Sequence, residues 1–517
     1  MQEISSLKGN RKSSDNISIS YNTFFLVSLC YLVLPAIIMV LGWIKLLIAL
    51  PASALLIFAL VSALKNEQSL SSDRKIELTK TQFAAIIIFS LVSTIIAGVG
   101  EIVAPMYDHA FRRAMLRDLV NYNWPIYYDL SKQSNPIVNA MLPDCTVAYS
   151  YYSTFWMIPA LLGKLLGFNA ANIALIIWSA FGTFLILTGI TFYTKKFTYA
   201  SLFMFVCYSG LDVIPYFYYL NREQESWMWL EGWTEHISYI SNINHLLNVF
   251  NQCLPCWLIL ILLMTSRSNR HIGLVGGIMF TYSPWATIGV LPVAVYALLS
   301  KEKGIKGIFS VANIVSALTI LGCFAPMYMA NSSATSVSGT TLSFYKSISA
   351  LLVAYILVML IEVVPSVLLL YKSYGRDKLL WVAVGTLMIL PFYKISNFND
   401  LTMRGAMPAQ FVLCVMIIAV IGRFFDENID KKTGRITCKL GVKVIGSVLI
   451  LIAMAFVAFQ QILLVGFKTM NRSQSDVTEE IGSFGDIRVE DYAETVNGNF
   501  FVYDYEDQFF YRYMARR

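Results

Sequence analysis

Apolar runs of roughly twenty residues recur along this chain from Tyr21 almost to its C-terminus, and they limit the folds open to it. A helix of that length crosses about 30 Å of hydrocarbon. Lipid offers no partner to an unpaired backbone group, so such runs must be helical. Composition agrees, since 57% of residues are hydrophobic, 14% are charged and the mean hydropathy is +0.60. The sequence therefore predicts an all-α polytopic membrane protein.

The apolar runs divide into about thirteen predicted transmembrane helices. They cover residues 22–43, 46–64, 82–104, 169–192, 197–213, 248–266, 272–284, 286–300, 307–330, 346–371, 379–395, 407–422 and 442–466. The two runs that flank Ser283-Pro284-Trp285 are short for two crossings, which leaves a single broken helix open. Residues 149–167 form a further apolar segment that either crosses the membrane or lies on its surface as an amphipathic helix.

Lysine and arginine collect on the cytoplasmic side of membrane proteins, so their positions test the placement of residues 149–167. If this segment lies flat, the main basic clusters all fall on one side. They centre on Lys8, Lys75, Lys195, Arg267, Lys303, Arg376 and Lys431. If it crosses, the clusters at Lys195 and Arg267 change sides. The charges thus favour a flat segment, a cytoplasmic N-terminus and an outward C-terminus in the plasma (inner) membrane.

Five regions follow from this topology. They are a cytoplasmic segment 1–20, a transmembrane hairpin 21–80, a core 81–300 with outer loops 105–168 and 214–247, C-terminal transmembrane helices 301–467, and an outward tail or small cap 468–517. The first outer loop is expected to be large and to contain amphipathic helices. Most of the net charge of +7 is explained by topology, so it gives no support for nucleic-acid binding.

Asp108 lies just beyond an apolar run, where a carboxylate is costly to keep, so it is a candidate functional residue. On a helix His109 and Arg113 share a face, and Asp108 can pair with Arg112 four residues on. The alternative is an amphipathic surface helix whose arginines contact lipid headgroups.

Asp212 is predicted at the outward end of the run 197–213, where a negative charge opposes the helix dipole. The loop that follows carries Glu231 and His236 among several tryptophans. Aromatic residues there are typical of interfacial anchors. Aromatic faces with interspersed carboxylates also suit a sugar ring, which has apolar faces and hydroxyl edges.

Asp400 and Arg404 immediately precede another apolar run. An arginine at that depth can hold a phosphate through paired hydrogen bonds. The alternative is a side chain that extends to the membrane surface. Glu362 is a mid-span acid that either lines a cavity, pairs with a polar neighbour or relays protons. No glycine-rich phosphate loop is present, which disfavours ATP-driven transport.

The order of these parts resembles the GT-C superfamily of membrane glycosyltransferases, which includes protein mannosyltransferases and the aminoarabinose transferases of lipid A. A span ends near Glu101 and Asp108 follows in a large outer loop. An interfacial helix then ends in KLLGFN, and later spans bring Asp212 outward. The resemblance covers about residues 83–300, and SGLD and NDLTMR are similar to motifs of poorly characterised bacterial members. The N-terminal hairpin is extra, and PDCTVAYSYYS replaces the family's proline-proline-leucine segment.

The resemblance implies an inverting glycosyltransferase that moves a sugar from a polyprenyl-phosphate donor to a glycan, lipid or protein acceptor on the outer face. Asp108 and Asp212 take the catalytic roles, and the resemblance leaves open that they hold a divalent cation, Mg²⁺ or Mn²⁺. The substrate and phosphate contacts are expected from Arg404, Asp400, Arg112, Arg113, His109, Glu231 and His236. Two alternatives remain: a transporter or flippase of a lipid-linked saccharide, with Glu362 as its proton site, and a noncatalytic partner in envelope-polysaccharide assembly.

Overall fold

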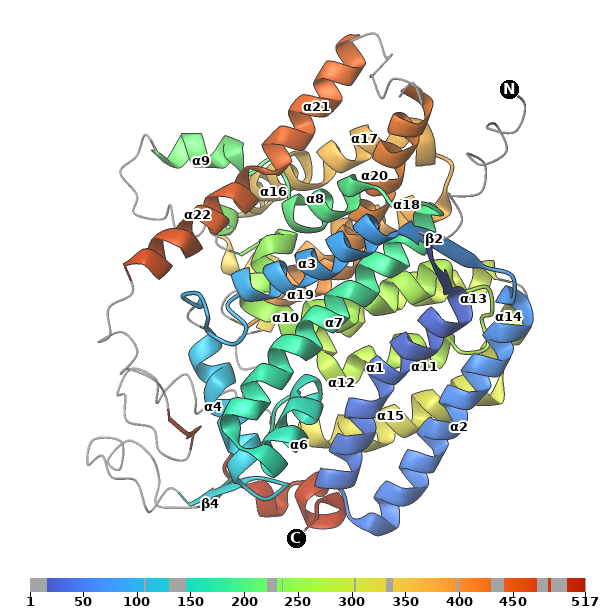
Figure 1. The fold of residues 1–517 in the computed structure, drawn as a ribbon. Helices are drawn as coiled ribbons and strands as arrows, with labels where there is room; N and C mark the ends of the chain where they lie inside the picture. Colours follow the sequence, from blue (N-terminus) through green and yellow to red (C-terminus); the bar gives the residue numbers. More distant parts are fainter. Residues whose placement is uncertain are drawn as a thin grey trace, which may run out of the picture.

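A computed structural model gives the fold of the chain as a bundle of helices (Figure 1). It describes residues 16–106, 108–129, 146–220, 230–234, 236–301, 304–331, 338–396, 399–428, 441–471, 482–484 and 500–516. Within these ranges, eight helical segments are long and apolar enough to cross a membrane. They are α1 (Tyr21–Trp43), α2 (Leu46–Ser71), α7 (Phe168–Thr194), α10 (Asn242–Thr265), α15 (Val311–Met329), and the combined segments Ile348–Tyr374, Asp400–Asn428 and Val442–Met470. The prediction of an all-α polytopic membrane protein is confirmed at this level.

Three of these segments are interrupted, and their parts carry separate labels. The first consists of α16 (Ile348–Val358), the π-helical turn η7 (Met359–Val363) and α17 (Val364–Tyr374); the second of α19 (Asp400–Gly405) and α20 (Met407–Asn428); the third of α21 (Val442–Met454) and α22 (Phe456–Met470). The central helix is α10. Of its most apolar stretch 94% is buried, whereas only 33% of the corresponding stretch of α2 is buried. Helices such as α2 and α21 expose apolar side chains outward, as expected of surfaces that face lipid.

The other five predicted spans are shorter helices. They are α3 (Lys80–Ile96), α8 (Tyr199–Cys207), the pair α11 (Ile272–Gly277) and α12 (Met279–Tyr282), α13 (Pro284–Ser300), and α18 (Lys378–Ile389). The nine residues of α8 rise only about 14 Å, too little for a crossing. Between α12 and α13 the backbone of Ser283 is extended, and its hydroxyl accepts a hydrogen bond from Ala286 N (3.2 Å). A serine cap followed by a proline starts a new helix there.

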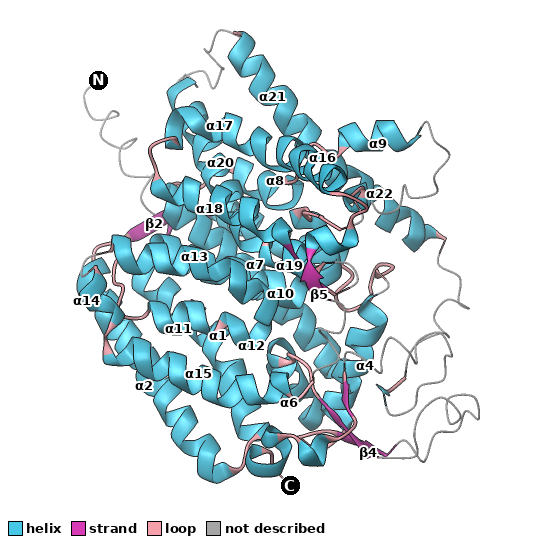
Figure 2. Ribbon diagram, turned by 180° about the vertical axis from the view of Figure 1, so that it is seen from behind, coloured by secondary structure: helices cyan, strands magenta, loops and turns pink. Residues whose placement is uncertain are grey.

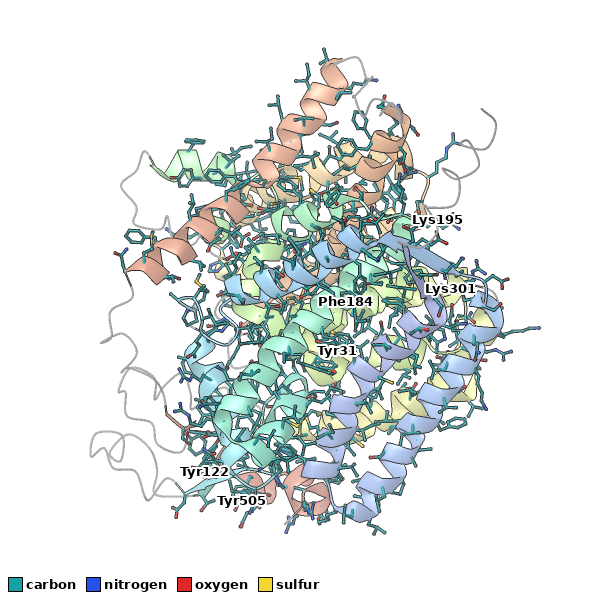
Figure 3. The ribbon with its side chains drawn as sticks, viewed as in Figure 1. Tyr31, Tyr122, Phe184, Lys195, Lys301 and Tyr505 are labelled. Carbon is teal, nitrogen blue, oxygen red and sulfur yellow. The ribbon has the colours of Figure 1, made fainter. Side chains whose placement is uncertain are left out.

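Two sets of contacts mark opposite ends of the bundle. At one end β1 (Asn16–Ser20) pairs antiparallel with β2 (Lys75–Thr79). At the other, which we call the tail end, β3 (Tyr127–Asp129), β4 (Thr146–Tyr149) and β7 (Phe501–Val502) form a three-stranded sheet. Figure 2 shows β2 and β4 far apart. In Figure 3, Lys195 and Lys301 lie toward the first end, and Tyr122 and Tyr505 lie at the tail end. The basic ends of α7 and α13, at Lys195 and Lys301, thus lie away from the sheet of β3, β4 and β7.

Residues 149–167 begin and end at the tail end. They follow β4 and contain η2 (Thr154–Trp156) and α6 (Met157–Leu166), which stops at Gly167 with φ +91°. Lys164 Nζ donates to the carbonyl of Tyr122 (2.6 Å), just after α4 (Asp108–Asn121). The next helix, α7, also starts there, because Asn172 donates to Gly100 O (3.3 Å). The segment therefore doubles back beside α4.

Short elements complete the fold. They are α9 (Val213–Leu220), η4 (Leu230–Gly232), α14 (Ile305–Ile308), β5 (Ser338–Thr340), η6 (Thr341–Phe344), η8 (Leu390–Phe392), β6 (Tyr393–Ile395), η11 (Tyr505–Asp507) and η12 (Phe510–Met514). Strands β5 and β6 pair antiparallel. In the C-terminal tail, Lys45 N donates to Met514 O (2.8 Å), and Ile44 bridges Ala515, so the end of the chain is attached to the turn between α1 and α2.

Candidate functional site

Four charged residues and a tyrosine gather where α4, α19 and the stretch after β4 come together, and we call them the arginine cluster: Asp108, Arg112, Tyr152, Asp400 and Arg404. Asp108 opens α4 and pairs with Arg112 Nη2 at 3.2 Å, as the four-residue spacing predicts. In α19 the same spacing joins Asp400 Oδ1 to Arg404 Nε at 3.0 Å. Each arginine therefore has an acid on its own helix, and two separate helices bring the pairs together.

The two arginines interact electrostatically across this cluster. Arg404 Nη1 donates to the hydroxyl of Tyr152 (2.8 Å), and Arg112 lies within electrostatic reach of both Tyr152 and Arg404. Arg404 in turn lies within electrostatic reach of Asp108. The side chains of Arg112 and Arg404 are only 12% and 18% exposed, so two like charges share a poorly solvated place. Burial accordingly lowers the pKa of Arg112.

Arg112 has one hydrogen-bond donor that is not used within the described part of the protein. Its Nη1 atom is buried and has no hydrogen-bond partner among the described residues. Asp108 is 47% exposed and is reachable from solvent. A buried cationic donor without an acceptor is costly, and an anionic oxygen would satisfy it. The arginine cluster therefore has the chemistry of an anion site with an accessible carboxylate at its edge.

A small pocket, partly open to solvent, adjoins Arg112. It is lined by Gly98, Val99, Gly100, Glu101, His109, Arg112, Arg113, Leu116, Asn172, Leu175 and Phe250. Gly98, Gly100 and Glu101 have φ of +81°, +81° and +59°, a left-handed backbone that favours glycine. This turn brings Glu101 onto Arg113, with which it forms an ion pair. Arg113 is thus bound within the protein rather than directed at Arg404.

His109 faces inward from α4. Its Nε2 atom lies 2.8 Å from the carbonyl of Leu247, and the ring stacks on Phe250 at 5.5 Å between centroids. Burial, assisted by the charge of Arg112, lowers the pKa of His109 to about 3. The neutral His109 thus donates its Nε2 hydrogen to the carbonyl of Leu247 and joins α4 to α10. This nitrogen is therefore already used in a hydrogen bond within the protein.

Three carboxyl groups form a second group, the acid cluster: Asp212, Glu231 and Glu362. They are 0%, 1% and 6% exposed. Ser209 Oγ donates to Asp212 Oδ2 (2.7 Å), and Glu231 accepts from Ser241 N (2.7 Å) and Asn244 Nδ2 (2.7 Å). Burial, and after it the charge of Asp212, raises the pKa of Glu231 well above its usual range.

Asp212 is buried beyond the end of α8, because the helix within the predicted span 197–213 ends early. Helix α8 stops at Cys207, and the chain then turns inward so that Leu211 N donates to Ile361 O (2.9 Å) in η7. The absence of a side chain at Gly210 makes room for Glu362, since a Cβ there would lie 2.0 Å from Glu362 Oε2. Asp212 is thereby enclosed by protein.

The first turn of α10 lies between the two clusters. Asn244 donates to Glu231, and its neighbour His245 lies within electrostatic reach of Arg404. The interactions described for Asp212 involve Ser209, Glu231, Glu362 and Trp233, and none involves Asp108 or Arg404. The structure thus brings Asp108 and Arg404 together and places Asp212 in a neighbouring, enclosed group.

His236 occupies a third place. Its Nδ1 atom lies 3.1 Å from Lys394 Nζ, and its carbonyl accepts from Asn399 Nδ2 (2.7 Å). Asn399 also caps α19, the helix that carries Asp400 and Arg404. Through Asn399, His236 is therefore linked to the helix that carries Asp400 and Arg404. Much of the tryptophan-rich loop in which it was predicted lies outside the described residues.

Metal binding stays a prediction from the resemblance. Within the described ranges, no three histidine, cysteine, aspartate or glutamate side chains come close enough together to hold a metal ion. Asp108 is bonded to Arg112 and Asp212 to Ser209, and no described contact joins the two carboxylates. These residues do not form a common ligand set.

Two features of the site were not predicted from the sequence. Tyr151 and Tyr152 stack on each other at 3.9 Å, Tyr152 accepts a hydrogen bond from Arg404, and Glu362 finds its partners in Asp212 and Glu231. The paired tyrosines in YSYYS, between a strand and an interfacial helix, were the available signal for the first. Nothing in the sequence indicates the partners of Glu362, because they depend on the break after α8.

No family model, curated protein or solved structure matches the chain.

Proposed function

We propose that this protein is an inverting membrane glycosyltransferase that transfers a sugar from a polyprenyl-phosphate donor to a glycan, lipid or protein acceptor on the outer face of the membrane. The observation that carries the proposal is the electrostatic proximity of Arg112 and Arg404 beside the accessible carboxylate of Asp108. A sugar phosphate ester needs positive charge at its leaving group and a base at the attacking hydroxyl. The arginine cluster supplies both, at the end of a bundle whose outer helices expose apolar surface to a lipid tail.

In the proposed reaction the donor phosphate binds Arg112 and Arg404, with the free Nη1 of Arg112 as one donor. Phosphate then competes with Asp108 for Arg112, which leaves the carboxylate free to accept a proton. The acceptor hydroxyl gives its proton to Asp108 as its oxygen bonds to the anomeric carbon. The bond from that carbon to the phosphate oxygen breaks, and the electron pair leaves with the polyprenyl phosphate. Tyr152 fixes Arg404 in place.

The acid cluster has a supporting part in this proposal. Glu231 holds the first turn of α10 through Ser241 and Asn244, and His245 on that turn lies near Arg404. The resemblance makes Asp212 a catalytic acid. In this proposal Asp212 instead influences Glu231 and does not contact the acceptor. The tail end is proposed to face outward, with the N-terminus cytoplasmic.

The test is transfer of a labelled sugar from a polyprenyl-phosphate donor by the purified protein in lipid nanodiscs. We expect Asp108→Asn to lower turnover by about 10²–10⁴-fold, the usual contribution of a general base. Asp426→Asn is the matched control, because Asp426 pairs with Lys196 away from the site and is 51% exposed. Near-normal turnover by Asp108→Asn, with the donor still bound, would contradict the assignment.

The acid cluster favours one other function, a proton-coupled transporter or flippase of a lipid-linked saccharide. Acidic groups enclosed within a membrane protein are typical of proton relays, and Glu362 lies inside a candidate span. Movement of the lipid-linked sugar across sealed vesicles without release of polyprenyl phosphate would establish this function. Glu362→Gln should then abolish the movement. Release of polyprenyl phosphate together with a glycosylated acceptor would establish the transferase instead.

A further inference from the structure

The described part of the C-terminal tail is attached beside the arginine cluster. Strand β7 pairs with β4 in the register Ala148↔Val502 and Tyr149↔Phe501. One residue further on, Ser150 N donates to Phe500 O (2.9 Å). The hydroxyl of Tyr511 donates to the carbonyl of Tyr149 (2.9 Å). These bonds fix the stretch of chain that leads directly into Tyr151 and Tyr152.

A second attachment joins the tail to α4. Asp118 Oδ2 accepts hydrogen bonds from Phe484 N (2.9 Å) and from the hydroxyl of Tyr128 (2.8 Å). The preceding α4 residue, Arg117, donates through Nη1 to Gly482 O (3.0 Å). The ring of Phe484 stacks on Phe500 at 4.7 Å between centroids. Phe500 is therefore held from two sides, by the strand pairing and by Phe484.

A line of aromatic rings runs from Phe500 to Arg404. The ring centroid of Phe500 lies 4.6 Å from that of Tyr151, and Tyr151 stacks on Tyr152 at 3.9 Å. The Tyr152 hydroxyl accepts the hydrogen bond from Arg404 Nη1 (2.8 Å). Tyr151 and Tyr152 lie between β4 and η2, in a stretch without regular secondary structure. Their ring positions consequently depend on what packs against them.

We infer that Phe500, in the described part of the C-terminal tail, is a positioning residue that sets Arg404 through Tyr151 and Tyr152. The inference rests on the proposed function, in which Arg404 holds the donor phosphate. Phe500 touches no substrate. When its ring is removed, Tyr151 loses its support, the Tyr152 hydroxyl moves, and the Arg404 guanidinium is no longer held for phosphate.

The inference predicts a loss of donor affinity with little loss of turnover at saturation. Phe500→Ala should raise both the donor KM and the dissociation constant for a short polyprenyl phosphate about tenfold, equivalent to 1.4 kcal/mol. Phe500→Tyr, which keeps the ring, should restore both values to within about twofold, a difference of roughly 0.4 kcal/mol. Phe509→Ala is the matched control, because Phe509 belongs to the same tail and is 61% exposed.

A double-mutant cycle separates positioning from general destabilisation. Tyr152→Phe removes only the hydroxyl that Arg404 contacts, and we expect it to weaken polyprenyl-phosphate binding by a similar factor. If Phe500 acts through Tyr152, the double variant should bind about as weakly as either single variant, because both break one path. Additive losses would show that Phe500 acts by another route and would overturn the inference.

The binding experiment also distinguishes failure of this inference from failure of the proposed function. If the wild-type protein binds polyprenyl phosphate and Phe500→Ala binds it equally well, the inference alone is wrong. If the wild-type protein has no affinity for polyprenyl phosphate, the proposed function fails and the inference fails with it. Protease protection of the tail, measured on each variant, identifies whether the tail is still attached.

Discussion

The arginine cluster and the acid cluster lie on either side of the first turn of α10, yet they are built in opposite ways. The arginine cluster consists of two ion pairs, each within one helix, and Asp108 is still 47% exposed. The acid cluster draws single residues from three distant segments and leaves each of them at most 6% exposed. One group is open to a ligand, and the other is closed.

This difference assigns different properties to the two groups. An accessible carboxylate beside converging arginines suits chemistry on an anionic substrate, because the charges are needed only when a ligand arrives. Enclosed acids in contact with one another bind protons and fix the backbone around them. We therefore expect changes in the arginine cluster to alter function, and changes in the acid cluster to alter stability first.

After Asp108→Asn, the largest effect is expected from Arg404→Ala. Loss of one charged donor to the leaving phosphate should lower kcat/KM for transfer by about 10²–10³-fold. The free energy of unfolding should change by less than about 1 kcal/mol, since both partners of Arg404 keep access to solvent or to other groups. Steady-state transfer assays and thermal unfolding in nanodiscs measure the two quantities.

Arg404→Lys sharpens this test. Lysine keeps the charge but loses the paired donor geometry, so recovery should be only partial. Full activity in Arg404→Ala, or a large loss of stability with the activity per folded molecule intact, would remove the functional contrast between the clusters.

The second effect concerns Glu231. Replacement by alanine removes the acceptor for Ser241 N and Asn244 Nδ2 at a buried position, which should destabilise the protein by about 2–4 kcal/mol. Glu231→Gln retains an acceptor and should lose less. Thermal unfolding of both variants is the measurement. If Glu231→Ala unfolds like the wild type but loses activity, the acid cluster belongs to the functional site and our division is wrong.

The third effect tests the packing of Gly210 against Glu362. A Cβ at residue 210 would meet Glu362 Oε2 at 2.0 Å, so Gly210→Ala should destabilise the protein by about 1–3 kcal/mol through overpacking. Gly385→Ala is a suitable control, because nothing lies within 4 Å of a Cβ there and alanine favours helix. Equal melting temperatures for the two variants would show that the acid cluster is more loosely packed than its burial indicates.

Local rules in the sequence predicted the arginine cluster better than the acid cluster. The Asp108–Arg112 pair follows from helical spacing alone and is confirmed. The long apolar segments follow from length and composition. The burial of Asp212 was not predicted, because an apolar run gives no warning that α8 stops after nine residues. Its partners Glu231 and Glu362 are brought to it by tertiary packing, which no periodicity encodes.

The tail shows the same limit over a longer distance. Asp118 and Phe484 lie 366 residues apart, and the pairing of β4 with β7 joins segments on either side of most of the bundle. Strands of two to four residues have no distinctive pattern. The sequence predicted a tail or small cap, but only the fold identifies Tyr149 and Tyr151 as residues that the described part of the tail contacts.

The smallest effect is a pH dependence of tail attachment at Asp118. Burial raises the pKa of its carboxyl to about 6, although the hydrogen bonds from Ser483, Phe484 N and Tyr128 and the charge of Arg117 oppose that rise. The pKa is higher in the folded protein than in an unfolded chain, so folding around Asp118 takes up a proton: its contribution is complete below pH 4 and is lost as the pH rises through about 6. The change in the free energy of unfolding should be on the order of 1 kcal/mol. Hydrogen exchange at Phe484 N and Val502 N between pH 4 and 7, corrected for intrinsic rates, should show weaker protection at higher pH, and Asp118→Asn should remove the trend. Protection that strengthens with pH in the wild type, or persists unchanged in Asp118→Asn, would mean that strand pairing with β4 rather than Asp118 controls attachment of the tail beside the arginine cluster.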